Sequence, residues 1–146
     1  MTTTRVEPDE AARLVGEHWN YLDVRSVPEF EQGHPDGAFN IPLLEAVPGQ
    51  GLRPNPDFLD VCKASFPADA RLVVGCKSGG RSAKAAQQLE AAGFTSVVDM
   101  RGGFGGEVDA GGRVACAGWQ ARGLPVSSAA QPGRSYAELK QRKAGA

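Results

Sequence analysis

A strand–helix–strand pattern between residues 71 and 100 constrains the fold more than any other feature of the sequence. The apolar run RLVVG (71–75) is too short for a helix, and SVVDM (96–100) has the same character. Between them, SAKAAQQLEAAG (82–93) is rich in the helix formers Ala, Gln, Leu and Glu and ends in glycine. Strands that alternate with helices in this way predict a three-layer α/β/α domain with a mostly parallel sheet.

The first half of the chain repeats this alternation. Short apolar runs predict strands over 20–24 and 38–43. Helical signals predict helices over 8–18, 27–33 and 56–66. Stretches rich in Pro and Gly are expected to be irregular loops, over 47–56 and 101–118.

Size and charge exclude several classes of protein. With 146 residues the chain is expected to form one domain, and a net charge of -1 gives no electrostatic reason to bind nucleic acid or an anionic membrane. No apolar run approaches the ~20 residues of a membrane helix, and the charged start does not resemble a secretory signal. We therefore expect a protein without nucleic-acid or membrane partners.

The cysteines and histidines indicate a reducing compartment and no metal site. Three cysteines, an odd number, stand far apart at positions 62, 76 and 116, which favours free thiols and a cytoplasmic location. No CxxC pair is present, and the two histidines are remote from each other, so no zinc site is expected.

Cys76 stands where the strand over 71–75 stops, and ligands in such sheets gather where strands end. Gly79 and Gly80 allow a sharp turn that brings backbone N–H groups round to the sulfur, and the next helix adds the positive end of its dipole. Lys77 and Arg81 add formal charge. These features favour the thiolate of Cys76 and an anion bound beside it, which together predict covalent catalysis on an oxyanion-like substrate.

At this point the sequence resembles the rhodaneses, the sulfurtransferases, in their single-domain form. The matching stretches are YLDVRSVPEFEQGHPDGAFNIPL, LVVGCKSGGRSAKAAQQLEAAGFTSVVDMRGGF and GWQARGLPV. The resemblance implies five mainly parallel strands with helices on both faces. It also implies a rhodanese domain over 1–126, with a glycine-rich insertion over 105–118, followed by a C-terminal tail over 127–146. In this tail, SYAE is a capping box before a short basic helix, expected to be solvated and frayed.

The resemblance implies that Cys76 takes a sulfane sulfur from a small anionic donor such as thiosulfate. It then carries the sulfur as a persulfide to an acceptor thiol, of a small molecule or a protein, or to cyanide. No cofactor is implied. The residues expected to bind substrate are those of the loop that follows the cysteine: Lys77, Ser78, Gly79, Gly80, Arg81 and Ser82.

Two other functions stay open. The family has phosphatase cousins, and phosphatase or arsenate reductase chemistry is the first alternative. Only four residues separate Cys76 from Arg81, whereas cell-cycle phosphatases have five, and the shorter loop suits sulfur. The second alternative is a non-catalytic module for binding or sensing. Such modules usually lack the cysteine, which is present here.

Several roles within the site have two interpretations. Arg81 either clamps the donor's sulfonate or locks the loop, and Ser82 either contacts the substrate or caps the helix. Asp23 either supports the catalytic loop by holding Arg81 or a loop N–H, or caps the next turn. For Arg25 we favour a pair with Glu29.

The remaining thiols and the insertion also carry expectations. Cys62 lies on an apolar helix face and is expected to pack in the core. Cys116 lies in the insertion and is expected to be exposed. The insertion is expected to fold over the catalytic loop as a lid or to contact a partner.

Overall fold

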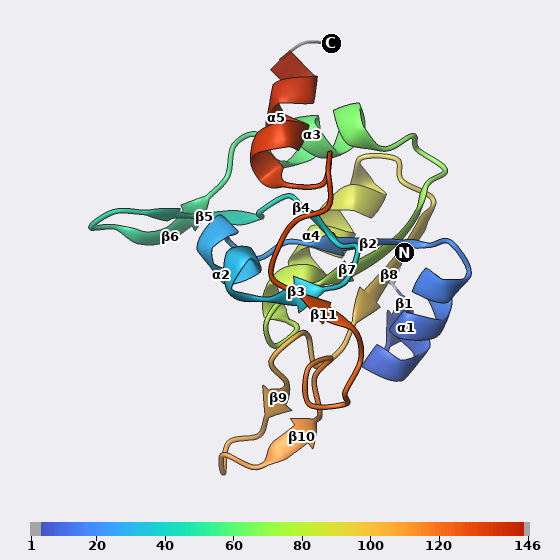
Figure 1. Ribbon diagram of the computed structural model, residues 1–146, viewed down its shortest axis with the longest axis vertical. Helices are drawn as coiled ribbons and strands as arrows, with labels where there is room; N and C mark the ends of the chain where they lie inside the picture. Colours follow the sequence, from blue (N-terminus) through green and yellow to red (C-terminus); the bar gives the residue numbers. More distant parts are fainter. Residues whose placement is uncertain (1–3, 145–146) are drawn as a thin grey trace.

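The computed structural model describes residues 4–144 (Figure 1). Its centre is a five-stranded sheet of order β1-β8-β7-β2-β4, in which every neighbouring pair is parallel. The strands of this sheet are β1 (Thr4–Val6), β2 (Asn20–Asp23), β4 (Phe39–Asn40), β7 (Arg71–Gly75) and β8 (Ser96–Met100). The sequence-based prediction of a mostly parallel five-stranded α/β sheet is therefore confirmed.

Helices cover both faces of the sheet, which gives the three layers. They are α1 (Pro8–Gly16), α2 (Val27–Gln32), α3 (Phe58–Ser65), α4 (Gly80–Ala91) and α5 (Tyr136–Ala144). On one face Leu72 and Val74 of β7 pack with side chains of α3 and α4, and on the other Val73 packs with side chains of α1. Alternate residues of one strand thus serve two separate apolar cores.

Two glycine-rich segments that were expected to be irregular loops form hairpins instead. β5 (Leu44–Val47) pairs with β6 (Gly51–Pro54), and within the insertion β9 (Glu107–Val108) pairs with β10 (Val114–Cys116). Both hairpins extend outward from the body of the domain (Figure 1). The expectation of loops was wrong here because the Gly and Pro residues of the turns dominate the sequence signal, and the strands beside them are short.

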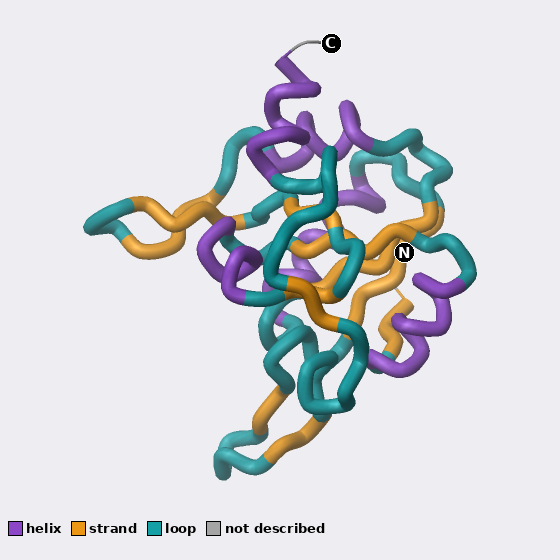
Figure 2. Tube along the Cα trace, in the orientation of Figure 1, coloured by secondary structure: helices purple, strands orange, loops and turns teal. Residues whose placement is uncertain are grey.

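The last segment of the chain is packed rather than solvated. β11 (Val126–Ser127) pairs with β3 (His34–Pro35), and a loop then leads to α5 beside α3 (Figure 2). Tyr136 and Leu139 of α5 are buried in the same core as α3. The expected solvated helix is therefore wrong, since two apolar side chains one turn apart anchor it.

No helix in residues 4–144 combines the length and the apolar character needed to cross a membrane.

Candidate active site

Cys76 lies between the end of β7 and the start of α4, at the carboxyl edge of the sheet. Its side chain is buried, with 1% of the residue exposed. The backbone N–H of Gly79, the N-cap of α4, donates to the Cys76 Sγ over 3.1 Å. The next amides, of Gly80 and Arg81, belong to the first turn of α4 and have no carbonyl partner within the helix. The sulfur thus lies where unpaired amides and a helix dipole favour negative charge.

Glycines allow the loop to pass this closely. Gly79 has φ +113°, in the left-handed region, and a Cβ there would lie 2.7 Å from the guanidinium of Arg5. A Cβ on Gly75 would overlap the hydroxyl of Tyr21 beneath the loop. A side chain is therefore disfavoured at Gly79 by its positive φ and at Gly75 by the buried ring of Tyr21.

A second glycine segment, residues 102–105, supports the loop from outside, and sequence reasoning missed it. The N–H of Phe104 donates to the carbonyl of Cys76 over 2.7 Å, and the N–H of Gly105 to that of Lys77 over 2.8 Å. Gly103 has φ +60°, and a Cβ there would lie 2.5 Å from the Cys76 carbonyl oxygen. The GGFGG pattern was the available signal, because glycine is required where two backbones touch.

Arg81 binds a carboxylate. Its two terminal nitrogens donate to the two oxygens of Glu29 in α2, over 2.7 and 3.0 Å. Ser26 also donates to Glu29, from its hydroxyl and its backbone N–H. The hydrogen bonds from Arg81, and then those from Ser26, lower the pKa of Glu29 to about 2 against the opposing effect of burial. This arrangement favours the locking interpretation of Arg81.

Ser82 is fully buried, and its hydroxyl bonds to the loop backbone and to β8. Its hydroxyl donates to the carboxylate of Asp99 at the end of β8, and Arg5 binds the same carboxylate over 2.8 Å. Arg5 also donates to the carbonyl of Gly79 over 3.2 Å. Burial raises the pKa of Asp99 although both partners oppose it. Ser82 therefore anchors the first turn of α4, whose N-cap is Gly79 and not this serine.

Asp23 and Arg25 form an ion pair with each other, which was not predicted from the sequence. The guanidinium of Arg25 donates to both oxygens of Asp23, and its Nη2 donates to the carbonyl of Gly33 over 2.6 Å. The expected pairs of Arg25 with Glu29 and of Asp23 with Arg81 are wrong, because Glu29 and Arg81 bind each other. Asp23 does accept the backbone N–H of Arg25, so its turn-capping role holds.

Residues 7–106 match the rhodanese-like domain family. The chain belongs to this family.

Named relatives agree with this membership. Thiosulfate sulfurtransferase 16, chloroplastic, from Arabidopsis thaliana is 41% identical over 108 residues, covering 74% of this chain and 79% of the relative. Protein HIGH ARSENIC CONTENT 1, mitochondrial, from the same organism is 40% identical over 91 residues, covering 62% of this chain and 53% of the relative. The chain spans 55% of the length of two further curated relatives.

A solved structure has the same architecture. The crystal structure of Rv0390 from M. tuberculosis superposes with a TM-score of 0.74 at 26% identity, covering 88% of this chain and all of that one.

The loop before α4 borders a pocket through Lys77. Lys77 and Ser78 are the exposed residues of the loop before α4, and Lys77 lines a pocket of about 250 Å³. The pocket is otherwise lined by Arg25, Glu29, Gln32, Gly33, Phe104, Gly105 and Gln120. Arg25 is paired with Asp23, and Glu29 is paired with Arg81. Lys77 is therefore the lining cation that can attract an anion.

The other two cysteines are both buried. Cys62 is fully buried in α3, as expected, and burial raises its pKa to about 12. Cys116 is 5% exposed and accepts a hydrogen bond from Arg122 over 3.4 Å. The expectation that Cys116 is exposed was wrong, because β10 turns its sulfur toward Gly102.

The insertion does not form a lid over Cys76 in this structure. Its hairpin extends away from the domain (Figure 1). Gly105, the first residue of the insertion, and Phe104 just before it donate backbone hydrogen bonds to the loop. Among residues 4–144 no group of three His, Cys, Asp or Glu side chains could hold a metal ion.

Proposed function

We propose that the protein is a sulfurtransferase that carries a sulfane sulfur as a persulfide on Cys76. The observation that carries the proposal is the N–H of Gly79 pointing at the Cys76 sulfur from the start of α4. The N–H groups at the start of α4 stabilise the thiolate of Cys76 first. They then stabilise the terminal sulfur of the persulfide, which extends one atom further. Relatives named thiosulfate sulfurtransferase support this reading.

The first half-reaction uses a donor such as thiosulfate. The thiolate of Cys76 attacks the outer sulfur, a new S–S bond forms, and the donor's own S–S bond breaks with its electron pair leaving on sulfite. Lys77 at the rim of the pocket attracts the dianion. The unpaired amides of Gly80 and Arg81 bind the negative charge that collects beside the sulfur.

The second half-reaction returns the enzyme to its starting state. An acceptor thiolate attacks the outer sulfur of the Cys76 persulfide, Cys76 leaves as a thiolate, and the acceptor departs as a persulfide. Cyanide in the same role leaves as thiocyanate. Neither half-reaction needs an added oxidant, reductant or cofactor.

Intact-protein mass spectrometry tests the proposal. Incubation with thiosulfate is expected to add the mass of one sulfur atom, which cyanide or dithiothreitol then removes. Cys76→Ser is expected to abolish the adduct. The matched controls Cys62→Ser and Cys116→Ser are expected to retain it, and full transferase activity in Cys76→Ser would contradict the mechanism.

Arsenate reduction is the second candidate, because one relative carries a name that refers to arsenic content. Thiosulfate, arsenate and p-nitrophenyl phosphate assayed side by side separate the candidates. We expect turnover with thiosulfate, and a higher kcat/KM for either of the other two would favour the alternative.

A cytoplasmic location is likewise a proposal, supported by three cysteines that form no disulfide. Cell fractionation tests it, and recovery of the protein in an oxidising compartment would contradict it.

A further inference from the structure

A second pocket lies away from Cys76, between α2 and the C-terminal segment. Its volume is about 370 Å³, whereas a cavity of roughly 150 Å³ already binds benzene. It is lined by Val27, Phe30, Glu31, Asn40, Ser128, Ala129, Ala130, Ser135, Tyr136 and Ala137. Val27, Phe30 and Glu31 are spaced along one face of α2, and the first two residues of α5, Tyr136 and Ala137, also line the pocket.

One of the residues that line this pocket, Asn40, has a buried acceptor without a hydrogen-bond partner. Asn40 is 1% exposed, and its Nδ2 donates to the carbonyls of Asp23 and Arg25, over 3.0 Å each. These two bonds fix which end of the amide is the nitrogen. The Oδ1 atom is buried and has no hydrogen-bond partner. A buried acceptor without a donor lowers the stability of the fold. A ligand that donates an N–H to this oxygen would form the missing hydrogen bond and gain binding energy from it.

The charges around the pocket favour a cation. Glu31 contributes a carboxylate, and no lysine or arginine is among the lining residues. Lys140 approaches the ring of Tyr136, but its ammonium lies 3.6 Å from the carboxylate of Asp57 in the direction of α3. The N-terminus of α5 does not offer an anion site, because Glu138 accepts hydrogen bonds from Gly133 and Ser135 there.

The apolar lining residues favour a ligand whose remaining part is apolar. Phe30 and Tyr136 supply aromatic rings, and Ala129, Ala130 and Ala137 add small uncharged side chains. The pocket depends on residues 128–137, which lie beyond the stretch that matches the family. The site is therefore a feature of this chain's own C-terminal segment.

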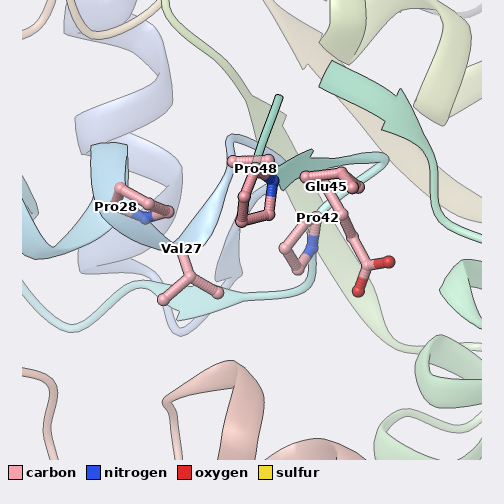
Figure 3. Close-up of a pocket in the computed structure, with 7 residues that line it drawn as sticks. Val27, Pro28, Pro42, Glu45 and Pro48 are labelled. Atoms are coloured by element: carbon pink, nitrogen blue, oxygen red, sulfur yellow. The ribbon is translucent and has the colours of Figure 1, made fainter. Parts of the chain in front are cut away.

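A neighbouring pocket of about 240 Å³ provides a contrast (Figure 3). It shares Val27 but is otherwise formed by three prolines, Glu45, Ala46 and Val47, and contains no unsatisfied buried group within the described chain. Its lining does not select one ligand.

We propose that the pocket between α2 and α5 binds a small primary amine with an apolar body. The ammonium group lies between the Asn40 Oδ1 and the Glu31 carboxylate, and the apolar body packs against Phe30 and the three alanines. This site is separate from the sulfur chemistry at Cys76, and its test does not depend on that chemistry.

Isothermal titration calorimetry with three probes of similar shape tests the proposal on the full chain. We expect 2-phenylethylamine to bind saturably at one site. The alcohol 2-phenylethanol, a donor without charge, should bind about threefold to tenfold more weakly, and phenylacetate should not bind. No saturable binding of the amine, or equal binding of phenylacetate, would overturn the proposal.

Two exposed positions place the binding without disturbing the core. Ala130→Phe fills the pocket and should abolish amine binding, whereas Ala64→Phe, at an exposed position of α3, should not change it. Glu31→Gln should weaken the amine about threefold to fivefold and leave the alcohol unchanged, and Asp69→Asn is its control. Unchanged amine binding in Ala130→Phe would place the ligand elsewhere and refute the site.

Discussion

Arg81 and Glu29 form a two-point ion pair that joins the first turn of α4 to α2. The two nitrogen–oxygen distances are 2.7 and 3.0 Å, and 17% of the Arg81 side chain and 27% of the Glu29 side chain are exposed. Because both ends are mostly shielded from water, the pair holds the loop that carries Cys76.

The pair predicts that Arg81→Ala affects stability more than donor affinity. Removing the guanidinium leaves Glu29 half-buried without its partner, which should cost about 1–3 kcal/mol in the free energy of unfolding by urea. The KM for thiosulfate should change less than about twofold. Arg13→Ala, which removes two exposed ion pairs at α1, with Glu10 and Glu17, should leave stability nearly unchanged. A large rise in KM with unchanged stability would instead establish Arg81 as a clamp for the donor.

Stability should also fall with acid because of Glu29. The pKa of this carboxyl is lowered to about 2 in the folded protein, chiefly by Arg81, from 4.5. A lowered pKa adds stability above the unfolded value, and this stability is lost as pH falls from about 4.5 towards about 2. Urea titrations should therefore show the difference between the wild type and Glu29→Gln shrinking across that window. A constant difference down to about pH 2 would show that the charge of Glu29 contributes nothing.

The contact between Gly103 and the catalytic loop predicts an effect of a single methyl group. Gly103→Ala puts a Cβ 2.5 Å from the Cys76 carbonyl oxygen, and Gly112→Ala, at a similar φ of +80°, meets nothing within 4 Å. Both substitutions place alanine in the left-handed region, which should lower the free energy of unfolding by about 1–2 kcal/mol. Only Gly103→Ala also displaces backbone, which should cost about 1–3 kcal/mol more. Thermal unfolding should show the difference in stability, and persulfide formation should slow only in Gly103→Ala. Equal behaviour of the two variants would mean that the loop yields freely.

The part of the site that is local in sequence was predictable. The apolar run of β7, the helix formers of α4 and the glycines between them act within about twenty residues, so their order placed Cys76 at the sheet edge. Sheet topology, however, needed the family resemblance, because β1 is only three residues long and is defined by its pairing with β8.

Pairing between distant residues was not predictable. Glu29 and Arg81 are 52 positions apart. Both Arg25 and Arg81 were candidate partners for Glu29, and the sequence could not decide between them. The support from residues 102–105 was missed for a related reason. Its hydrogen bonds come from backbone N–H groups, which every residue but proline carries, so the bonds themselves leave no signal and only the GGFGG pattern marks the segment.

The packing of α5 gives a last prediction, on the C-terminal segment. Leu139 is fully buried against the core of α3, and the neighbouring Tyr136 hydroxyl accepts a hydrogen bond from Asn55 over 3.0 Å. Leu139→Ala should lower the free energy of unfolding by about 2–5 kcal/mol, because it removes buried methyl groups and leaves a cavity. Leu52→Ala, at a side chain 45% exposed in the β5–β6 hairpin, should cost less than about 1 kcal/mol. If Leu139→Ala were as mild as Leu52→Ala, α5 would contribute nothing to the core, and the amine pocket that depends on it would lose one wall.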